Sequence, residues 1–108
     1  MPEINLDMIT HPITRALIEA LQAGDVESWN SFFAPNAKLF DDGSPRDLKK
    51  FTQDALGHEH FTSIDKIENG GLSITGHFHT ASWGDFVTYF RIYLNKQNKI
   101  VKLDIGQA

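Results

Sequence analysis

Apolar and polar residues alternate most regularly in the last quarter of the chain, over residues 86–94 and 99–107. Alternation with a period of two is typical of strands, because successive side chains point to opposite faces of a sheet. The polar run Asn-Lys-Gln-Asn at 95–98 separates the two segments and indicates a tight turn. We therefore predict a long β-hairpin around which the rest of the fold is organised.

The two faces of this predicted hairpin differ in chemistry. One face is almost wholly apolar and needs a cover; it carries Phe86, Thr88, Phe90, Ile92 and Leu94 with Val101, Leu103 and Ile105. The other face is aromatic and charged; it carries Val87, Tyr89, Arg91 and Tyr93 with Lys102 and Asp104. The sheet is therefore expected to have a core face and a semi-polar outer face.

Three helical patterns lie before the hairpin, with apolar residues repeating every three or four positions. Start and stop signals bound them at Pro12 and Gly24, at Asp25 and Pro35, and at Ser44 and Gly57. The apolar stripes are Ile13, Leu17, Ala20 and Leu21 in the first, Val26, Trp29 and Phe33 in the second, and Leu48, Phe51, Ala55 and Leu56 in the third. Residues 1–9 are expected to be a loose lead-in.

Further strands are predicted at 37–41, at 61–68 with irregular alternation, and at 72–83, with an Asn-Gly-Gly turn at 69–71. In the strand at 72–83, His77 and His79 fall on the outer face, while Ile74 and Phe78 continue the core face. Three helices, with the first strand inserted before the third, and then four strands as an antiparallel meander predict an α+β fold. We expect one domain over residues 1–108.

Composition limits the classes of function. A net charge of −4 argues against nucleic acid, whose binders need a basic face. The absence of cysteine excludes disulfides and thiol chemistry and is compatible with a reducing compartment. Neither a signal peptide nor an apolar run long enough for a membrane is found, so we expect a cytoplasmic protein without a membrane partner. No cofactor is indicated.

The segment that begins at Gly24-Asp25, continues through Trp29 and ends in the run 33–41 resembles the nuclear transport factor 2-like superfamily. Its bacterial members include SnoaL-like polyketide cyclases and ketosteroid isomerase, and residues 99–106 resemble the closing strand of the SnoaL-like branch. The resemblance covers about residues 12–107. It implies a cystatin-like cone, in which a curved, mostly antiparallel sheet wraps three N-terminal helices around an apolar pocket, commonly in a dimer. Enzymes and non-enzymes share this fold.

The same resemblance places the isomerase's general-base aspartate on Asp41, at the end of the first strand. The oxyanion-binding tyrosine and carboxylic acid of that enzyme fall on Leu17 and Phe90, and a supporting tyrosine falls on Thr52. Loss of one oxyanion donor typically costs about 10²–10³ in rate. Ketosteroid isomerase activity is therefore not expected of this chain.

Asp41 has two interpretations. It is a general base that removes a proton next to a carbonyl group, or Asp41 or Asp42 caps the Asp-Asp-Gly-Ser turn. Thr88 and Gln107 are expected to face the pocket and to orient a ligand or polarise its oxygen. The expected pocket residues are Leu17, Trp29, Phe33, Phe51, Phe78, Thr88, Phe90, Leu103 and Gln107.

His77 and His79 have the spacing of zinc ligands on one side of a strand. A third ligand is missing unless the His-Glu-His segment at 58–60 reaches across, so no metal site is predicted. With Tyr89, Arg91 and Tyr93 these histidines form a face rich in residue types that are common at interfaces. We expect a homodimer through this face of the sheet.

Three hypotheses for function remain open. The first is binding of a small apolar or aromatic molecule in the cone. The second is an isomerase- or cyclase-type enzyme with Asp41 as the base. The third is a non-catalytic dimerisation or interaction module whose own side chains fill the cone.

Overall fold

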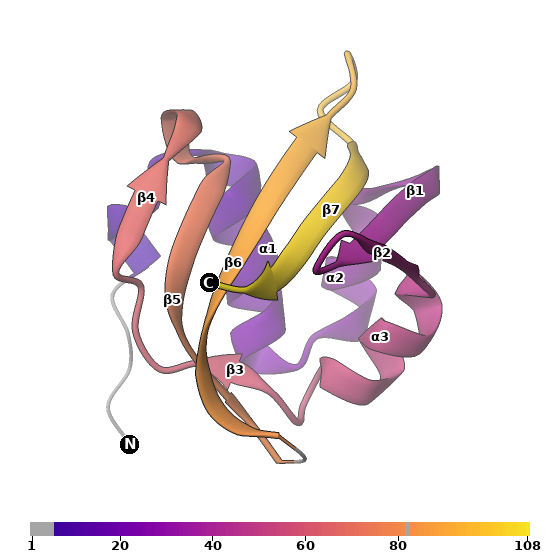
Figure 1. Ribbon diagram of the computed structural model, residues 1–108. Coiled ribbons are helices and arrows are strands. Elements are labelled where there is room, and N and C mark those ends of the chain that lie inside the picture. The colour runs from indigo at the N-terminus through magenta and orange to yellow at the C-terminus, as the bar shows by residue number, and fades with distance from the viewer. Residues whose placement is uncertain (1–5, 82) are drawn as a thin grey trace.

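A single seven-stranded sheet dominates the computed structural model, which describes residues 6–81 and 83–108. Its strands are β1 (Phe33–Asp41), β2 (Ser44–Arg46), β3 (His60–Phe61), β4 (Lys66–Glu68), β5 (Ser73–Thr80), β6 (Gly84–Leu94) and β7 (Ile100–Gln107). The order is β2-β1-β7-β6-β5-β3, and β4 also pairs with β5. Pairing is antiparallel except between β1 and β7, so the C-terminal ends of these two strands lie at the same edge (Figure 1).

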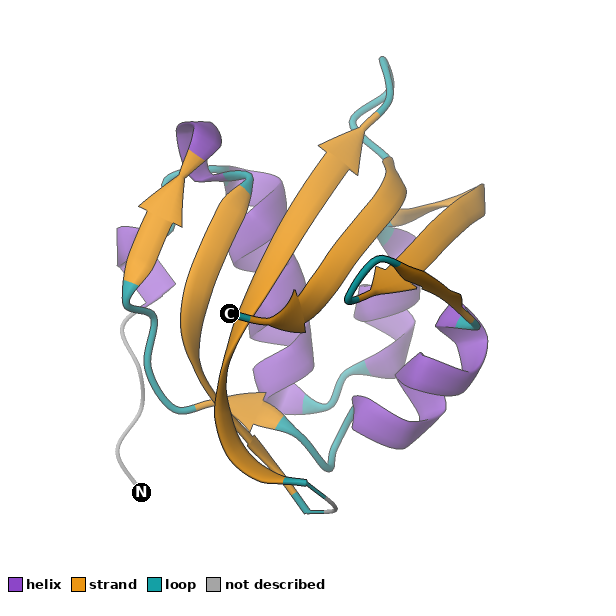
Figure 2. Ribbon diagram, viewed as in Figure 1, coloured by secondary structure: helices purple, strands orange, loops and turns teal. Residues whose placement is uncertain are grey.

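The helices α1 (Pro12–Ala23), α2 (Val26–Ser31) and α3 (Leu48–Ala55) lie on one side of the sheet (Figure 2). As predicted, α1 begins at Pro12 and ends at Gly24, whose φ of 68° is the left-handed conformation that glycine tolerates best. Leu17 and Leu21 of α1 are buried in the same core as Phe90 and Leu103 from the sheet. The fold is therefore a mixed α+β fold with three helices on an open sheet.

The predicted hairpin is present as β6 and β7, with Phe90 opposite Ile105 and Ile92 opposite Leu103 on the core face. One detail of the predicted alternation is wrong. A register shift after Tyr93 pairs Leu94 with Ile100, which is fully buried, and leaves Val101 only partly buried. A bulge adds one residue to a strand, so the simple alternation no longer identifies the inward side chain.

The second helix is shorter than predicted, because Phe33 and Pro35 belong to β1. Phe33 pairs with Ile100, and the backbone N–H of Ile100 donates to the Phe32 carbonyl at 2.8 Å. The β1–β7 register shifts between Phe33 and Lys38, and this irregular stretch accommodates a proline that has no N–H to donate. A long-range strand pairing has overridden the local helical spacing.

The third helix does not start at Ser44. Asp42 and Gly43 both have positive φ values, 51° and 83°, and form a tight hairpin turn that pairs Ser44 with Asp41. Aspartate followed by glycine favours this type of turn, which takes Ser44 and Pro45 into β2. Asp47 is the actual N-cap of α3, and its side chain accepts a hydrogen bond from the Lys50 N–H at 3.1 Å.

The predicted strand at 61–68 is divided into β3 and β4, which both pair with β5. Between them the backbone of Ser63 lies directly over Gly76, where any side chain would collide with the Ser63 carbonyl. The predicted strand at 72–83 ends at Thr80, and residue 82 lies outside the described part of the chain. In the expected lead-in, Leu6–Met8 form a 3₁₀ turn and Ile9 is fully buried, while residues 1–5 are outside the description.

Candidate functional site

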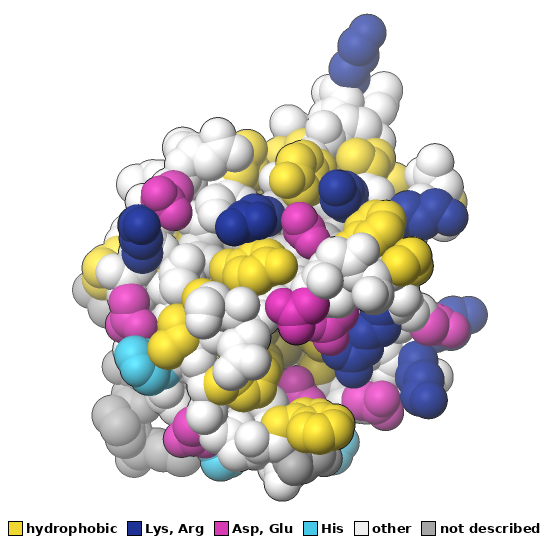
Figure 3. All heavy atoms as spheres, in the orientation of Figure 1, with side chains coloured by type: hydrophobic (Ala, Val, Ile, Leu, Met, Phe, Trp, Pro, Cys, Tyr) yellow, Lys and Arg dark blue, Asp and Glu magenta, His cyan; other side chains and the backbone are white. Residues whose placement is uncertain are grey.

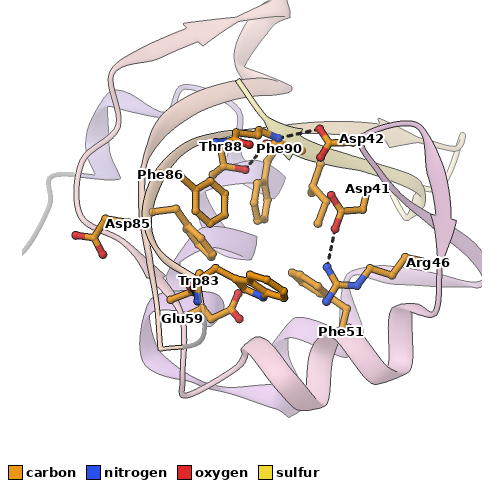
Figure 4. A pocket seen from close by; sticks show the side chains of 15 residues that line it. Asp41, Asp42, Arg46, Phe51, Glu59, Trp83, Asp85, Phe86, Thr88 and Phe90 are labelled. Carbon is orange, nitrogen blue, oxygen red and sulfur yellow. Dashed lines mark hydrogen bonds and ion pairs between the residues drawn. The ribbon is translucent and has the colours of Figure 1, made fainter.

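A cavity of about 470 Å³ opens where the ends of β1 and β7 approach the start of β6, the end of β5 and α3 (Figure 4). Five aromatic side chains line it: Phe51, Phe78, Trp83, Phe86 and Phe90. Its acidic and basic lining residues are Asp41, Asp42, Glu59, Asp85 and Arg46. The remaining lining residues are Thr80, Thr88, Ile105, Gly106 and Gln107. The cavity therefore joins an aromatic wall to a strongly polar rim.

The aromatic wall comes mainly from alternate positions of β5 and β6. The ring of Phe78 lies 6.1 Å from that of Phe86 and 6.0 Å from that of Phe90, measured between centroids. Trp83, in the turn between these strands, is 81% exposed, and its indole extends toward the cavity beside Glu59 (Figure 4). A large apolar ring left in water at the mouth of a cavity is available to contact a ligand.

Asp41 and Arg46 face each other across the β1–β2 hairpin. A guanidinium nitrogen of Arg46 donates to the Asp41 carboxylate at 2.7 Å, and both side chains are more than one third exposed. The same guanidinium lies over the ring of Phe51, with its carbon 5.0 Å from the ring centroid. Asp41 therefore lines the cavity as one half of an ion pair and not as an isolated, desolvated carboxylate.

Asp42 holds the β1–β2 turn against the end of β7. Its carboxylate accepts a hydrogen bond from the Gln107 N–H at 3.0 Å, and its own N–H donates to the Ile105 carbonyl at 2.9 Å. A side chain at Gly106 would collide with this carboxylate and with the Tyr89 hydroxyl. The Asp42 carboxylate thus ties the turn to β7 and does not cap the turn locally, while the Asp41 carboxylate pairs with Arg46.

Glu59 lines the cavity from the loop between α3 and β3. Partial burial raises its pKa, and this effect exceeds the opposing influence of the Arg46 charge; Asp54 raises the pKa further. Within the described residues its carboxylate has neither a hydrogen bond nor an ion pair. In the sequence Glu59 stands out only as part of the His-Glu-His metal candidate, because no periodicity marks the loop between α3 and β3.

The threonine hydroxyl groups of the cavity donate hydrogen bonds to backbone carbonyls. Thr88 donates to the Gly106 carbonyl at 2.6 Å, and Thr80 donates to the Gly84 carbonyl at 3.0 Å. A hydroxyl has one proton, so the Thr88 oxygen offers only lone pairs to a ligand. Thr88 is therefore unsuited to polarising a carbonyl oxygen, which requires a donor.

The structure separates the expected pocket residues into two groups. Phe51, Phe78, Thr88, Phe90 and Gln107 lie around the cavity together with Asp41. Leu17, Trp29, Phe33 and Leu103 do not line it; Leu17, Trp29 and Leu103 are fully buried in the core, and Phe33 packs against it. The sequence pattern identifies inward-facing positions but cannot separate those that fill the core from those that line a cavity.

The five residues expected at a dimer interface are on the outer side of the sheet, away from the helices. Figure 3 shows this face, on which hydrophobic, acidic and basic side chains are mixed. The Arg91 guanidinium lies 4.3 Å from the centroid of the Tyr89 ring, and Tyr93 is 43% exposed. His77 and His79 contact Asp65 and Asp85. Burial and the nearby charge of Asp104 raise the pKa of Tyr89.

Ser63, His77 and Asp65 form a group whose composition matches a hydrolytic triad. The Ser63 hydroxyl and the Asp65 carboxylate lie 3.1 Å and 2.7 Å from the same ring nitrogen, Nδ1 of His77. A triad requires the serine and the acid on different ring nitrogens, so that the imidazole can move a proton. This exposed group is therefore not a nucleophilic site.

Residues 6–81 and 83–108 also contain no cluster of three or more side chains suited to a metal ion.

Several solved structures of other proteins align with this chain over most of its length. A nuclear transport factor 2-like protein of unknown function from Cytophaga hutchinsonii aligns over 99% of this chain and 93% of its own, with a TM-score of 0.71 and 12% identity. A predicted polyketide cyclase from Sinorhizobium meliloti aligns over 91% and 96%, with a TM-score of 0.72 and 14% identity. The chain therefore has the cystatin-like, nuclear transport factor 2-like fold.

A third structure is the orange carotenoid protein of Anabaena (Nostoc) binding canthaxanthin. It aligns over 87% of this chain but only 34% of its own, with a TM-score of 0.68 and 18% identity. No protein-family model and no curated protein matches the sequence. Within the described residues, no helix combines the length and the hydropathy that crossing a membrane requires.

Proposed function

We propose that this protein binds a small organic molecule with an apolar or aromatic body in the cavity. The observation that carries the proposal is the aromatic wall of Phe51, Phe78, Phe86 and Phe90 around about 470 Å³ of space. Ligand pockets are typically about 300–1,000 Å³, mostly apolar, with a few polar groups that set orientation. Asp41, Asp42, Glu59 and Gln107 supply such groups at the rim.

Two of the structural relatives are consistent with this proposal. The Anabaena protein binds canthaxanthin, and the Sinorhizobium protein is a predicted polyketide cyclase. An open cavity of ligand size also weighs against the interaction module whose cone is filled by its own side chains.

Binding is tested with Nile red, an uncharged dye that fluoresces in apolar sites. Gln107→Trp would place an indole in the mouth of the cavity, whereas Ala108→Trp adds the same bulk at the next, exposed position, which does not line it. Gln107→Trp should weaken dye binding at least about tenfold, because the ring occupies the space, and Ala108→Trp should leave it unchanged. Equal dye binding by both variants, with both folded by circular dichroism, would contradict the proposal.

A second proposed function is proton abstraction from a carbon next to a carbonyl group, as in an isomerase or cyclase. Glu59 favours it, because a carboxyl group with a raised pKa is a stronger base near neutral pH. Asp41, the base suggested by the resemblance, is neutralised by Arg46 and is the weaker candidate. Deuterium exchange at the acidic carbons of a panel of small ketones, followed by NMR, tests this: Glu59→Gln should abolish exchange, and Asp41→Asn should reduce it less.

We also propose that the outer face of the sheet forms a homodimer. Tyr89, Arg91 and Tyr93 are residue types enriched at interfaces, and they lie together on one exposed face. Sedimentation velocity should show a dimer that Tyr93→Glu dissociates, while Lys96→Glu, in the turn between β6 and β7, leaves it intact. A monomer at all concentrations of the unmodified protein would exclude this interface.

A further inference from the structure

We infer that the cavity selects a ligand that carries an ammonium group on an aromatic or apolar body. This inference rests on the proposed small-molecule binding and specifies the chemical class of the ligand. Three features of the described residues carry it: the balance of charge around the cavity, the acceptor oxygens of two threonines, and an aromatic wall against which a cation already lies.

Four carboxylates and one guanidinium line the cavity. Asp41 is neutralised by Arg46, and Asp85 contacts His79 and points away from the cavity (Figure 4). Among the described residues neither Asp42 nor Glu59 has an ion-pair partner, and the charges of Arg46 and His58 act on Glu59 without forming one. An anionic ligand would meet two like charges there, while a cation would satisfy them.

The two threonine hydroxyls of the cavity favour the same class of ligand. Thr80 and Thr88 use their protons on backbone carbonyls, so each offers only an acceptor, and the Thr80 oxygen already accepts one hydrogen bond from the Trp83 backbone N–H. The Arg46 guanidinium uses one of its five N–H groups on Asp41, so donors remain on Arg46, as they do on the Trp83 indole and the Gln107 amide. A protonated amine has donors and no acceptor, so it complements carboxylates and hydroxyl lone pairs.

The aromatic wall already holds one cation. The Arg46 guanidinium lies over the face of Phe51, and the more exposed Trp83 ring stands beside the unpaired Glu59. Tryptophan is the ring that attracts cations most strongly. An ammonium group between Trp83 and Glu59 would gain both a carboxylate partner and an aromatic face.

Three compounds with the same indole body test this inference: tryptamine is a cation, tryptophol is neutral and indole-3-acetate is an anion at pH 7. Titration calorimetry at low ionic strength should show tryptamine binding at least about fivefold more tightly than tryptophol, with indole-3-acetate weakest. Glu59→Gln should remove most of the preference for tryptamine over tryptophol. The matched control Glu68→Gln changes an exposed glutamate of β4 that does not line this cavity, and it should keep the preference.

The outcomes separate this inference from the function on which it rests. Nile red binding that Gln107→Trp blocks, with no preference for tryptamine among the three compounds, would overturn the inference and leave the proposed function standing. Failure of the dye to bind the unmodified protein would overturn both. A preference that persists unchanged in Glu59→Gln would also overturn the assignment, because the charge of Glu59 would then not select the ligand.

Discussion

The side-chain amide of Gln22 makes two hydrogen bonds to the backbone of Phe61. Its oxygen accepts from the Phe61 N–H at 2.7 Å, and its nitrogen donates to the Phe61 carbonyl at 2.9 Å. The amide pairs with both backbone polar groups of Phe61, as a neighbouring strand would. It thereby anchors β3, which has only two residues, to α1. Because Glu59 lies just before β3, the same contact helps to position the cavity rim.

Gln22→Leu should therefore destabilise the protein and disturb the cavity. It leaves the Phe61 N–H and carbonyl without partners, at a cost of about 1–3 kcal/mol in the free energy of unfolding. Urea denaturation measures this loss. Gln53→Leu makes the same change at an exposed position of α3 and should stay within about 0.5 kcal/mol of the unmodified protein. Equal effects of the two substitutions would contradict a specific role for Gln22.

The hydrogen bond between Trp29 and Thr52 joins α2 to α3 inside the core. The indole N–H of the fully buried Trp29 donates to the Thr52 hydroxyl at 2.9 Å. Thr52→Val has nearly the same shape but leaves this N–H unsatisfied, so we expect a loss of about 1–3 kcal/mol in thermal or urea unfolding. Thr52→Ser keeps the hydroxyl and should be the milder change; a reversed order would show that the methyl group matters more than the hydrogen bond.

Glu59 should make stability depend on pH. Its pKa in the folded state is raised above the ordinary 4.5, so the folded state favours the protonated form. That contribution to stability is complete below pH 4.5 and is lost as the pH rises through the raised pKa. Glu59→Gln should therefore raise the melting temperature at pH 8 and change it little at pH 4. A melting difference that stays constant between these pH values, or that has the opposite sign, would contradict the raised pKa.

Arg46→Gln should strengthen binding of tryptamine and not of tryptophol. The substitution frees the Asp41 carboxylate and removes the positive charge of Arg46, which repels the tryptamine cation. The effect on stability should be within about 1 kcal/mol, because ion pairs between exposed side chains contribute little. Calorimetry with both compounds checks this, and Lys66→Gln at the edge of the sheet serves as the control. Weaker tryptamine binding by Arg46→Gln would mean that Arg46 orients the ligand.

Gly76→Ala should be among the most damaging single-methyl changes in the sheet. A methyl group there would collide with the backbone carbonyl of Ser63, which cannot move without opening the segment between β3 and β4. We expect a loss of about 2 kcal/mol or more, in line with overpacking of a tight core. Thr75→Ala, at the neighbouring outward position, should cost less, and unfolding in urea distinguishes the two.

The pattern of side chains was enough to predict α1, the β6–β7 hairpin and the division of the sheet into two faces. These features depend on local periodicity and on capping residues such as Pro12 and Gly24, which act within a few positions of the chain. The resemblance in sequence added the cystatin-like α+β architecture, and the solved structures with this fold agree with it.

Features that depend on contacts between distant segments were decided by the tertiary structure. Phe33 becomes part of a strand because Ile100 pairs with it, and Ile100 enters the core because of a bulge. Trp29 satisfies helical spacing, yet only packing shows that it fills the core and does not line the cavity. Glu59 is in a loop without periodicity, and only the arrangement of α3, β3 and the β5–β6 turn brings it beside Trp83 at the rim. Local pattern thus determines which way a side chain faces, and long-range packing determines whether the space in front of it is filled or open.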